Sequence, residues 1–407
     1  MAPYLVMDYK DPINGAKGYA VVDTFINGVA GGGIRMREGL TQNEVVDLAH
    51  TMTLKFSLLE PILGGAKFGL DYNPKNPDKA KVLQRFVCAL KDFFLNCCVT
   101  GADINTTENE IIEALRKAGI PCPQYALAKA YCHDEEAVKE AILRFSKGIS
   151  LRVDDFVMND AITGYGVCCS AEKAMEILKL PIETSKIAIQ GFGKVGAPAA
   201  MYLSRLGATI VAISDVEATI FCESGLDIGF FHNNRDELGV IRKINLPSRY
   251  KILERDSLLY LPVDILIPAA VSNVINSENE SEIKAQLIVE VANNSIVTSA
   301  NQLLENHGIL VVPDFVANGG AAFLYGALIA HLVEPAPDSI MSSWKSLVQS
   351  NTTKVIELSR EKNICTRDAA VLLSQVNINN YIGNGGSSLP EGLALLQTES
   401  SLTISYL

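Results

Sequence analysis

The 407-residue sequence lacks the features that mark several classes of protein. No run of 18 apolar residues occurs, so no transmembrane helix is expected. The first residues carry no basic stretch followed by an apolar one, so no secretory signal peptide is predicted. Lys and Arg number 35 against 46 Asp and Glu, and this net charge of −11 is interrupted by no basic run. We therefore expect no nucleic-acid partner and no membrane partner.

Patterns typical of metal sites and disulfides are missing too. The five histidines are scattered, with no H-E-x-x-H spacing, and the nine cysteines form no C-x-x-C pair. This distribution predicts no metal site and favours reduced thiols in a cytoplasmic protein. Apolar residues are plentiful, at 48% of the chain, and the length favours two domains with buried cores.

The spacing of apolar residues predicts an α/β protein with two different halves. In the first half a strand is expected at 18–25, and amphipathic helices at 41–60, 78–94 and 105–119. The first and third of these helices open on a Thr-x-x-Glu capping box. Two further helices are expected near the end of the chain, at about 338–361 and 366–378.

From about residue 160 short apolar strands alternate with helices. The strands are expected at 185–190, 209–214, 263–268, 286–292 and 309–313. This alternation is typical of a parallel sheet with crossover helices.

A glycine-rich turn follows the strand at 185–190. Gly191, Gly193 and Gly196 have the spacing G-x-G-x-x-G, in which the glycines permit a tight turn, close approach of a pyrophosphate and close helix packing. Asp215 lies 19 residues beyond Gly196 at the end of the next predicted strand, where a carboxylate can accept hydrogen bonds from a ribose. The residues directly after it include no Lys or Arg for a 2′-phosphate, which favours NAD over NADP.

Three charged residues in the first 110 positions stand in unusual settings. Lys55 lies among apolar neighbours on a predicted helix, Lys67 follows two glycines in an apolar segment, and Asp103 precedes a helix. Taken singly, such lysines extend to solvent and such an aspartate caps a helix.

Ten short motifs place these residues in a common context. In chain order they are GGGIRM (31–36), LAHTMTLK (48–55), GGAKFG (64–69), ADINT (102–106), TGYGV (163–167), QGFGKVG (190–196), ISD (213–215), DILIPAA (264–270), VEVANN (289–294) and PDFVANGG (313–320). Their order and spacing, including the twelve residues between the two lysines, resemble those of the glutamate/leucine/phenylalanine/valine dehydrogenase family. The chain is similar to this family from about residue 18 to residue 380.

The resemblance implies NAD(P)-dependent oxidative deamination of an L-amino acid to the 2-oxo acid and ammonia, and the reverse reductive amination. It implies a substrate-binding and oligomerisation domain at 1–155 and a Rossmann-like NAD-binding domain at 156–340. The helices and tail at 341–407 would pack back on the first domain, and the substrate would lie in a cleft between the domains. The protein is expected to be a homo-oligomer.

The resemblance also implies a role for each matching residue. Lys67 would be the catalytic lysine, Asp103 would move protons to and from the amino group, and Lys55 would pair with the α-carboxylate. A nearby second ammonium and partial burial would lower the pKa of Lys67. Its flanking glycines would leave room for the substrate. The substrate site would be lined by Gly31, Gly32, Gly33, Asn318 and Tyr325. The cofactor site would be lined by Thr163, Gly191, Phe192, Gly193, Lys194, Val195, Gly196, Ser214, Asp215, Ala269, Ala270, Asn293 and Asn318.

Two positions depart from the glutamate enzymes. Gly31 stands where those enzymes carry a lysine for the distal carboxylate, and Tyr325 stands where they carry a serine. A buried carboxylate without partners costs several kcal/mol, so an apolar or aromatic amino acid is expected in place of glutamate, with Gly31 widening the pocket. Tyr325 would narrow the pocket, meet a polar side chain or point elsewhere. The direction of Phe68 is likewise open.

Three alternative functions are compatible with parts of the sequence. A regulatory homologue without turnover would bind the nucleotide, but the presence of Lys55, Lys67 and Asp103 together argues against it. A glutamate dehydrogenase with an altered pocket is a second alternative. A hydroxy-acid dehydrogenase would need a histidine as acid and base, and no histidine lies near the motifs.

Overall fold

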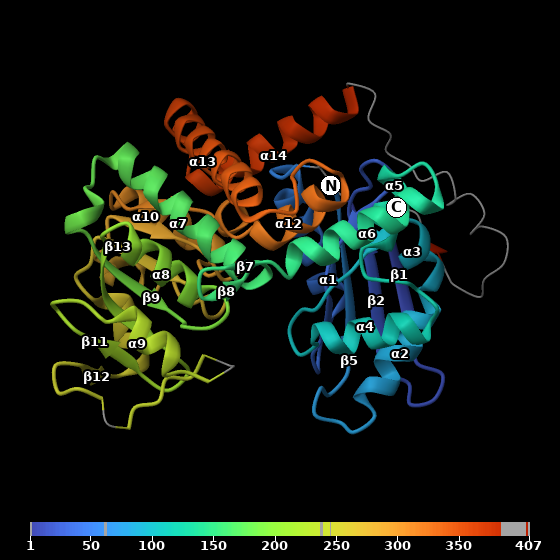
Figure 1. Ribbon diagram of the computed structural model, residues 1–407, viewed down its shortest axis with the longest axis horizontal. Helices are drawn as coiled ribbons and strands as arrows, with labels where there is room; N and C mark the ends of the chain where they lie inside the picture. The colour runs from blue at the N-terminus through green and yellow to red at the C-terminus, as the bar shows by residue number, and fades with distance from the viewer. Residues whose placement is uncertain (1, 61–62, 237–238, 245, 384–403, 406–407) are drawn as a thin grey trace. The chain divides into compact units, whose positions relative to one another are not determined.

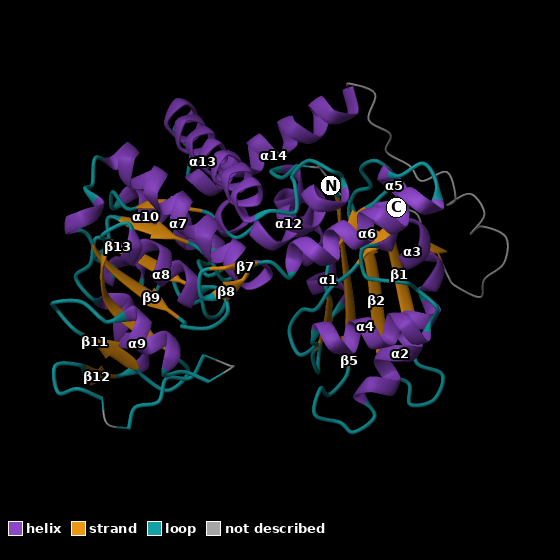
Figure 2. Cartoon of the chain, viewed as in Figure 1, coloured by secondary structure: helices purple, strands orange, loops and turns teal. Residues whose placement is uncertain are grey.

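A computed structural model of the protein describes residues 2–60, 63–236, 239–244, 246–383 and 404–405. The chain divides into two compact units. The first comprises Met1–Lys147, Tyr325–Leu332 and Ser374–Leu407, and the second Gly148–Leu324 and Val333–Leu373. Figure 2 shows that the strands form separate sheets flanked by helices. Of the helices described, none is long and apolar enough to cross a membrane.

The first unit is built on a mixed sheet in the order β16-β1-β2-β5-β3-β6, with β4 also paired to β5. β1 and β2 are antiparallel, as are β2 and β5, whereas β3 and β4 run parallel to β5. The strand expected at 18–25 is β2. The bounds are β1 Leu5–Lys10, β2 Lys17–Val22, β3 Ala30–Gly31, β4 Ile34–Met36, β5 Gly64–Asp71, β6 Cys98–Val99 and β16 Ile404–Ser405.

Helices cover both faces of this sheet (Figure 1). α1 (Gln42–Ser57) packs Val45 and Ala49 against Val21 on one face. The larger core on the other face is closed by α2 (Lys79–Ala89), α3 (Lys91–Asn96) and α4 (Glu108–Lys117), and α5 (Tyr125–Tyr131) packs against α3. The single helix expected at 78–94 is interrupted at Leu90, whose N–H caps α2, and both segments still bury their apolar side chains. Most of α6 (Glu135–Ile149) and the second half of α12 (Gly320–Ile329), from Tyr325, also belong to this unit.

The second unit contains the sheet predicted from the alternating strands, in the order β12-β11-β10-β9-β13-β14-β15. β10, β9, β13, β14 and β15 are parallel, whereas β11 pairs antiparallel with β10 and β12 pairs antiparallel with β11 at one end of the sheet. Strand order reverses at β9, with β10 on one side and β13 on the other, which is where such sheets bind ligands. The bounds are β9 Lys186–Gln190, β10 Thr209–Ser214, β11 Thr219–Phe221, β12 Lys251–Leu253, β13 Ile265–Pro268, β14 Leu287–Val289 and β15 Leu310–Val312.

Long helices pack beside this sheet. α13 (Pro337–Lys362) lies along α7 (Met158–Leu178) (Figure 1). Trp344 of α13 is fully buried against Gly166 and stacks on Phe323. α13 therefore belongs to the second unit, whereas the second half of α14, from Ser374, belongs to the first. We expected the whole chain from residue 341 to pack on the first unit, and only the part from Ser374 is assigned to it. The other elements are β7 Arg152–Val153, β8 Phe156–Val157, η1 Ile182–Thr184, α8 Gly196–Arg205, α9 Ile228–Asn233, η2 Arg255–Tyr260, η3 Glu280–Glu282, α10 Thr298–Asn306, α11 Asp314–Ala317 and α14 Thr366–Gly383.

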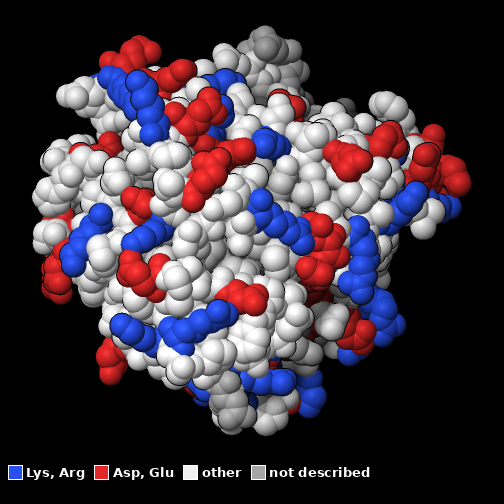
Figure 3. All heavy atoms as spheres, turned by 60° about the vertical axis from the view of Figure 1, so that its left-hand side comes forward, with Lys and Arg blue, Asp and Glu red and all other residues white. Residues whose placement is uncertain are grey.

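Charges of both signs are interspersed on the face shown in Figure 3, and the basic side chains there do not gather into one patch. All nine cysteines are free thiols. Within the described ranges, no three His, Cys, Asp or Glu side chains are grouped to hold a metal ion.

Candidate functional site

Lys67 lies on β5, in the middle of the first unit's sheet. Successive side chains on a strand point to opposite faces, so Lys67 and Phe68 face opposite ways. Phe68 is fully buried in the larger core, edge-to-face with Phe94, which answers the question of its direction. Lys67 is only 5% exposed, and its Nζ lies 2.7 Å from Oδ2 of Asp103.

A second cation meets the same carboxylate oxygen. Arg35 on β4 donates from Nε to Oδ2 of Asp103 at 3.0 Å and from Nη1 to Glu44 of α1 at 3.3 Å. The loop that carries Asp103 is tied to β4, because the hydroxyl of Thr106 donates to the carbonyl of Ile34 at 2.7 Å. Thus β4, β5 and one loop bring Arg35, Lys67 and Asp103 together.

These contacts shift the pKa values of both Lys67 and Asp103. Burial lowers the pKa of the Lys67 ammonium, Asp103 opposes this shift, and Arg35 adds to it. Burial alone would raise the pKa of Asp103, but the charges of Lys67 and Arg35 outweigh it and lower that pKa to about 2. At neutral pH Asp103 is therefore a carboxylate, and Lys67 releases its proton more readily than an ordinary lysine.

Arg35 is the residue that the sequence analysis missed. We expected a second ammonium near Lys67, but the neighbouring cation that lowers its pKa is the Arg35 guanidinium. Lys55 lies half-buried in the last turn of α1. The available signal was the arginine in the GGGIRM motif, four residues after Gly31.

The glycines around this site serve packing. A Cβ at Gly32 would overlap the carbonyl oxygen of Ala66, and one at Gly65 would overlap Thr53 of α1. The expectation that the glycines before Lys67 leave room for a substrate is therefore wrong, because protein atoms fill that space.

Gly31 does not open a pocket on its side-chain face either. A Cβ there would lie 2.7 Å from Val99 and 3.1 Å from the ring of Phe56. Both side chains are buried. Apolar side chains therefore fill the space beside Gly31, which does not widen a pocket on that face as we expected.

Tyr325 lies on α12 and is half-buried. Its ring packs edge-to-face on Phe145, with centroids 5.2 Å apart. Phe145 is 8% exposed, so the ring of Tyr325 is held against an apolar neighbour of the same unit.

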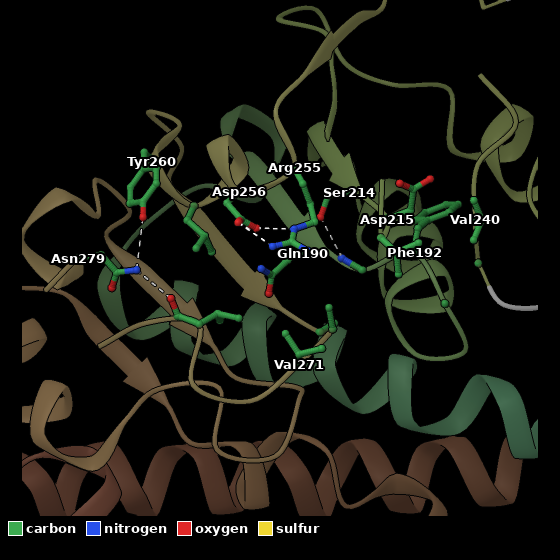
Figure 4. A pocket seen from close by; sticks show the side chains of 18 residues that line it. Gln190, Phe192, Ser214, Asp215, Val240, Arg255, Asp256, Tyr260, Val271 and Asn279 are labelled. Carbon is green, nitrogen blue, oxygen red and sulfur yellow. Dashed lines mark hydrogen bonds and ion pairs between the residues drawn. The ribbon is translucent and has the colours of Figure 1, made fainter. Parts of the chain in front are cut away.

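The second unit contains a pocket of about 410 Å³ at the carboxyl ends of β9, β10 and β13 (Figure 4). Seven of the predicted cofactor residues line it: Gly191, Phe192, Gly193, Ser214, Asp215, Ala269 and Ala270. η2 contributes Arg255 and Asp256, which pair with each other, and the arginine points into the pocket toward Gln190 (Figure 4).

The glycine turn fits a dinucleotide. Gly191 has a φ of +93°, which side chains disfavour, and a Cβ at Gly196 would overlap the carbonyl oxygen of Gly191. α8 begins at Gly196, so its N-terminal N–H groups face the end of the sheet where a pyrophosphate would bind.

Asp215 departs from its predicted role. Its Oδ1 accepts hydrogen bonds from the N–H groups of Glu217 and Ala218, at 2.8 and 2.9 Å. Its Oδ2 accepts from the Ile241 N–H at 2.8 Å and from Lys243 Nζ at 2.6 Å. A carboxylate has about four acceptor positions, so none is left for ribose hydroxyls in this arrangement.

Other predicted cofactor residues lie outside the pocket. Thr163 on α7 accepts a hydrogen bond from the Ala321 N–H at 3.2 Å. Lys194 pairs with Asp160 at the surface, and Val195 is the N-cap of α8. Asn293 and Asn318 contact each other, with Nδ2 of Asn318 3.0 Å from Oδ1 of Asn293.

Comparisons with known proteins agree with the resemblance in the sequence. Residues 157–382 match the family described as "Glutamate/Leucine/Phenylalanine/Valine dehydrogenase". Residues 4–117 match "Glu/Leu/Phe/Val dehydrogenase, dimerisation domain". A glutamate dehydrogenase of Aeropyrum pernix is 31% identical over 84% of this chain and 80% of its own. One of Thermotoga maritima is 30% identical over 88% and 83%.

Solved structures show the same fold. A hetero-hexameric glutamate dehydrogenase from Thermus thermophilus, in a leucine-bound form, superposes with a TM-score of 0.73 at 22% identity, covering 95% of this chain and 90% of that one. An L-tryptophan dehydrogenase from Nostoc punctiforme gives a TM-score of 0.63 at 21% identity, with coverage of 92% and 95%. Because one family match spans more than half of the chain and a relative is 31% identical over 84% of it, the chain belongs to the Glu/Leu/Phe/Val dehydrogenase family and is an amino-acid dehydrogenase.

Proposed function

We propose that the protein deaminates an apolar or aromatic L-amino acid oxidatively to its 2-oxo acid and ammonia, and catalyses the reverse reaction. The observation that carries this proposal is the buried group of Lys67, Asp103 and Arg35, in a chain whose other unit holds a dinucleotide pocket. A lysine with a lowered pKa and an ionised aspartate in contact can exchange protons with a reacting amino acid.

Each residue then has a distinct task. The dinucleotide supplies the acceptor for the hydride that leaves the α-carbon. Lys67 gives and takes protons as water adds to the imino acid and the carbinolamine collapses. Asp103 starts as a carboxylate, so it begins as the acceptor for the substrate's ammonium protons. Lys55 is proposed to pair with the α-carboxylate.

The side chain of the substrate is inferred from the surroundings of Gly31. Val99 and Phe56 occupy the space where a longer residue 31 would project, and both are buried and apolar. A distal carboxylate at this surface would have no cationic partner from position 31 and would pay its full desolvation cost.

Steady-state assays with L-leucine, L-phenylalanine, L-tryptophan and L-glutamate test this proposal. We expect kcat/KM for the preferred apolar substrate to exceed that for glutamate by at least about 100-fold, because an unpaired carboxylate costs several kcal/mol. A higher kcat/KM for glutamate than for the apolar amino acids would refute the proposal that the apolar surface at Gly31 determines substrate preference.

We propose NAD as the cofactor, on grounds that differ from those in the sequence. Lys243 is the cation beside Asp215, and it also pairs with Glu217 at 2.9 Å. Burial disfavours the charge of Lys243, but the two carboxylates outweigh this effect and raise its pKa. Two carboxylates and one ammonium leave an excess negative charge, which repels a 2′-phosphate.

Two substitutions are expected to move this preference in opposite directions. Lys243→Gln leaves both carboxylates without the ammonium, so the ratio of the Kd for NADPH to the Kd for NADH should rise by roughly fivefold. Glu217→Gln removes the excess negative charge and should lower this ratio of Kd values by a similar factor. The measurement is the ratio of the Kd values for NADPH and NADH at low salt. Equal ratios in all three proteins would exclude this cluster as a determinant.

We also propose that the protein self-associates. Residues 4–117 match a family segment described as a dimerisation domain, and the Thermus thermophilus relative is named as a hexamer. Light scattering coupled to size-exclusion chromatography should give a mass that is a multiple of 44.0 kDa.

A further inference from the structure

Two carboxyl groups are buried side by side at the ends of two parallel strands. Glu290 directly follows β14, and Asp314 is the first residue of α11, which comes after β15. β14 and β15 are neighbours in the sheet, and both side chains are fully buried. Burying two acids is costly unless they are neutralised or paired.

The partner comes from a distant part of the chain. Arg367, in the first turn of α14, donates from Nη1 to Asp314 Oδ1 at 2.9 Å and to Glu290 Oε2 at 3.3 Å. The guanidinium also lies over the ring of Phe315, 5.4 Å from its centroid. The start of α14 is fixed in turn, since Thr366 donates to Glu305 of α10 from both its N–H and its hydroxyl, at 2.6 and 2.7 Å.

The third bond of the guanidinium reaches the loop after β14. Nη2 of Arg367 donates to Oδ1 of Asn294 at 2.6 Å, and the N–H of Asn294 donates to the other oxygen of Asp314 at 2.9 Å. Asn294 has a φ of +51°, a backbone conformation that side chains rarely adopt. The guanidinium and Asp314 thus hold Asn294 from its side chain and from its backbone.

This arrangement orients the two asparagines that we predicted at the cofactor. Asn293 precedes the clamped residue, and Asn318 follows the α11 turn that begins at Asp314. Nδ2 of Asn318 donates to Val291 O at 2.9 Å and to Asn293 Oδ1 at 3.0 Å. Its own Oδ1 is buried and has no hydrogen-bond partner among the described residues, so one acceptor is left for a ligand's N–H.

We propose that Arg367 is a positioning residue, which fixes Asn293 and Asn318 so that they bind the nicotinamide half of the cofactor. The inference rests on the proposed dinucleotide function. The three hydrogen bonds of Arg367 require the planar guanidinium of arginine, because this one group donates to Asp314, Glu290 and Asn294 at the same time. Burial and the neighbouring Asp314 raise the pKa of Glu290, which disfavours a second negative charge beside Asp314.

Arg367→Lys tests this role in the full-length protein. The lysine keeps the positive charge but cannot reach both Asp314 and Asn294, so the asparagine loop should lose its fixed position. The probes are NADH, which carries the nicotinamide, and ADP-ribose, which lacks it. We expect the Kd for NADH to rise about tenfold, as for the loss of one charge-assisted hydrogen bond, and the Kd for ADP-ribose to stay within about twofold.

Two further variants make the result decisive. Asn294→Gly keeps the positive φ and removes the amide that Arg367 holds, so it should show the same selective loss of NADH binding even if Arg367→Lys folds poorly. Arg360→Lys, at an exposed arginine in the last turn of α13, is the matched control and should change neither Kd.

The outcomes separate the inference from the function on which it rests. Equal weakening of NADH and ADP-ribose, or no change in either, would overturn the positioning role of Arg367. Failure of the wild-type protein to bind NADH would instead refute the proposed cofactor.

Discussion

Replacing Lys67 by alanine is expected to reduce kcat by about 10³-fold or more, the usual contribution of a positioned acid–base group. The ammonium is buried and in contact with the carboxylate of Asp103. In a site with 5% exposure, bulk water cannot easily replace it as a proton carrier. Steady-state kinetics with the preferred amino acid provide the measurement.

The Lys67→Ala protein should otherwise be intact. The dinucleotide pocket lies in the other unit, so NADH should bind with its wild-type Kd. Lys81→Ala, at an exposed lysine of α2, is the matched control and should retain full activity. A Lys67→Ala enzyme with more than about a tenth of wild-type turnover would remove Lys67 from the mechanism.

Asp103→Asn is expected to cause a comparable loss of turnover, together with a change in pH dependence. Asp103 raises the pKa of Lys67 against the effect of burial, so its removal should lower that pKa further. The rising limb of kcat against pH, where Lys67 loses its proton, should therefore move to lower pH in the residual activity. A wild-type profile in the variant would contradict the coupling of the two groups.

The same substitution should alter stability in acid. The pKa of Asp103 is about 2 in the folded protein, against 3.8 as its ordinary value. A carboxyl group with a lowered pKa stabilises the fold above its unfolded pKa, and this contribution is lost as pH falls from about 4 to 2. The shift corresponds to about 2 kcal/mol. Urea denaturation should show that wild type loses more stability than Asp103→Asn across that window.

Much of this architecture could be predicted because it depends on local pattern. The strands β9, β10, β13, β14 and β15 are short apolar runs with turns at both ends, and each was found within two or three residues of its expected place. The capping box of α4 was likewise visible as Thr107 and Glu110. The glycine turn could be assigned to the first strand of the parallel sheet, because its glycines meet a steric requirement.

The parts that could not be predicted depend on contacts between distant segments. Arg35 meets Asp103 across 68 positions of sequence, and no periodicity marks that contact. Lys243 reaches Asp215 from a loop 28 residues later, so the search for a cation in the residues just after Asp215 missed it. The apolar surface at Gly31 is built by Phe56 of α1 and Val99 of β6, and a glycine letter alone does not say what fills the space beside it.

The central claim is that the Lys67 group carries out amino-acid deamination with a dinucleotide bound in the second unit. Its most direct test is to measure NADH and ammonia together while wild-type protein and Lys67→Ala act on L-leucine and L-phenylalanine. We predict equal amounts of NADH and ammonia from wild type with at least one of these substrates, and neither product from the variant. NADH binding by wild type without either product from any L-amino acid would contradict the claim.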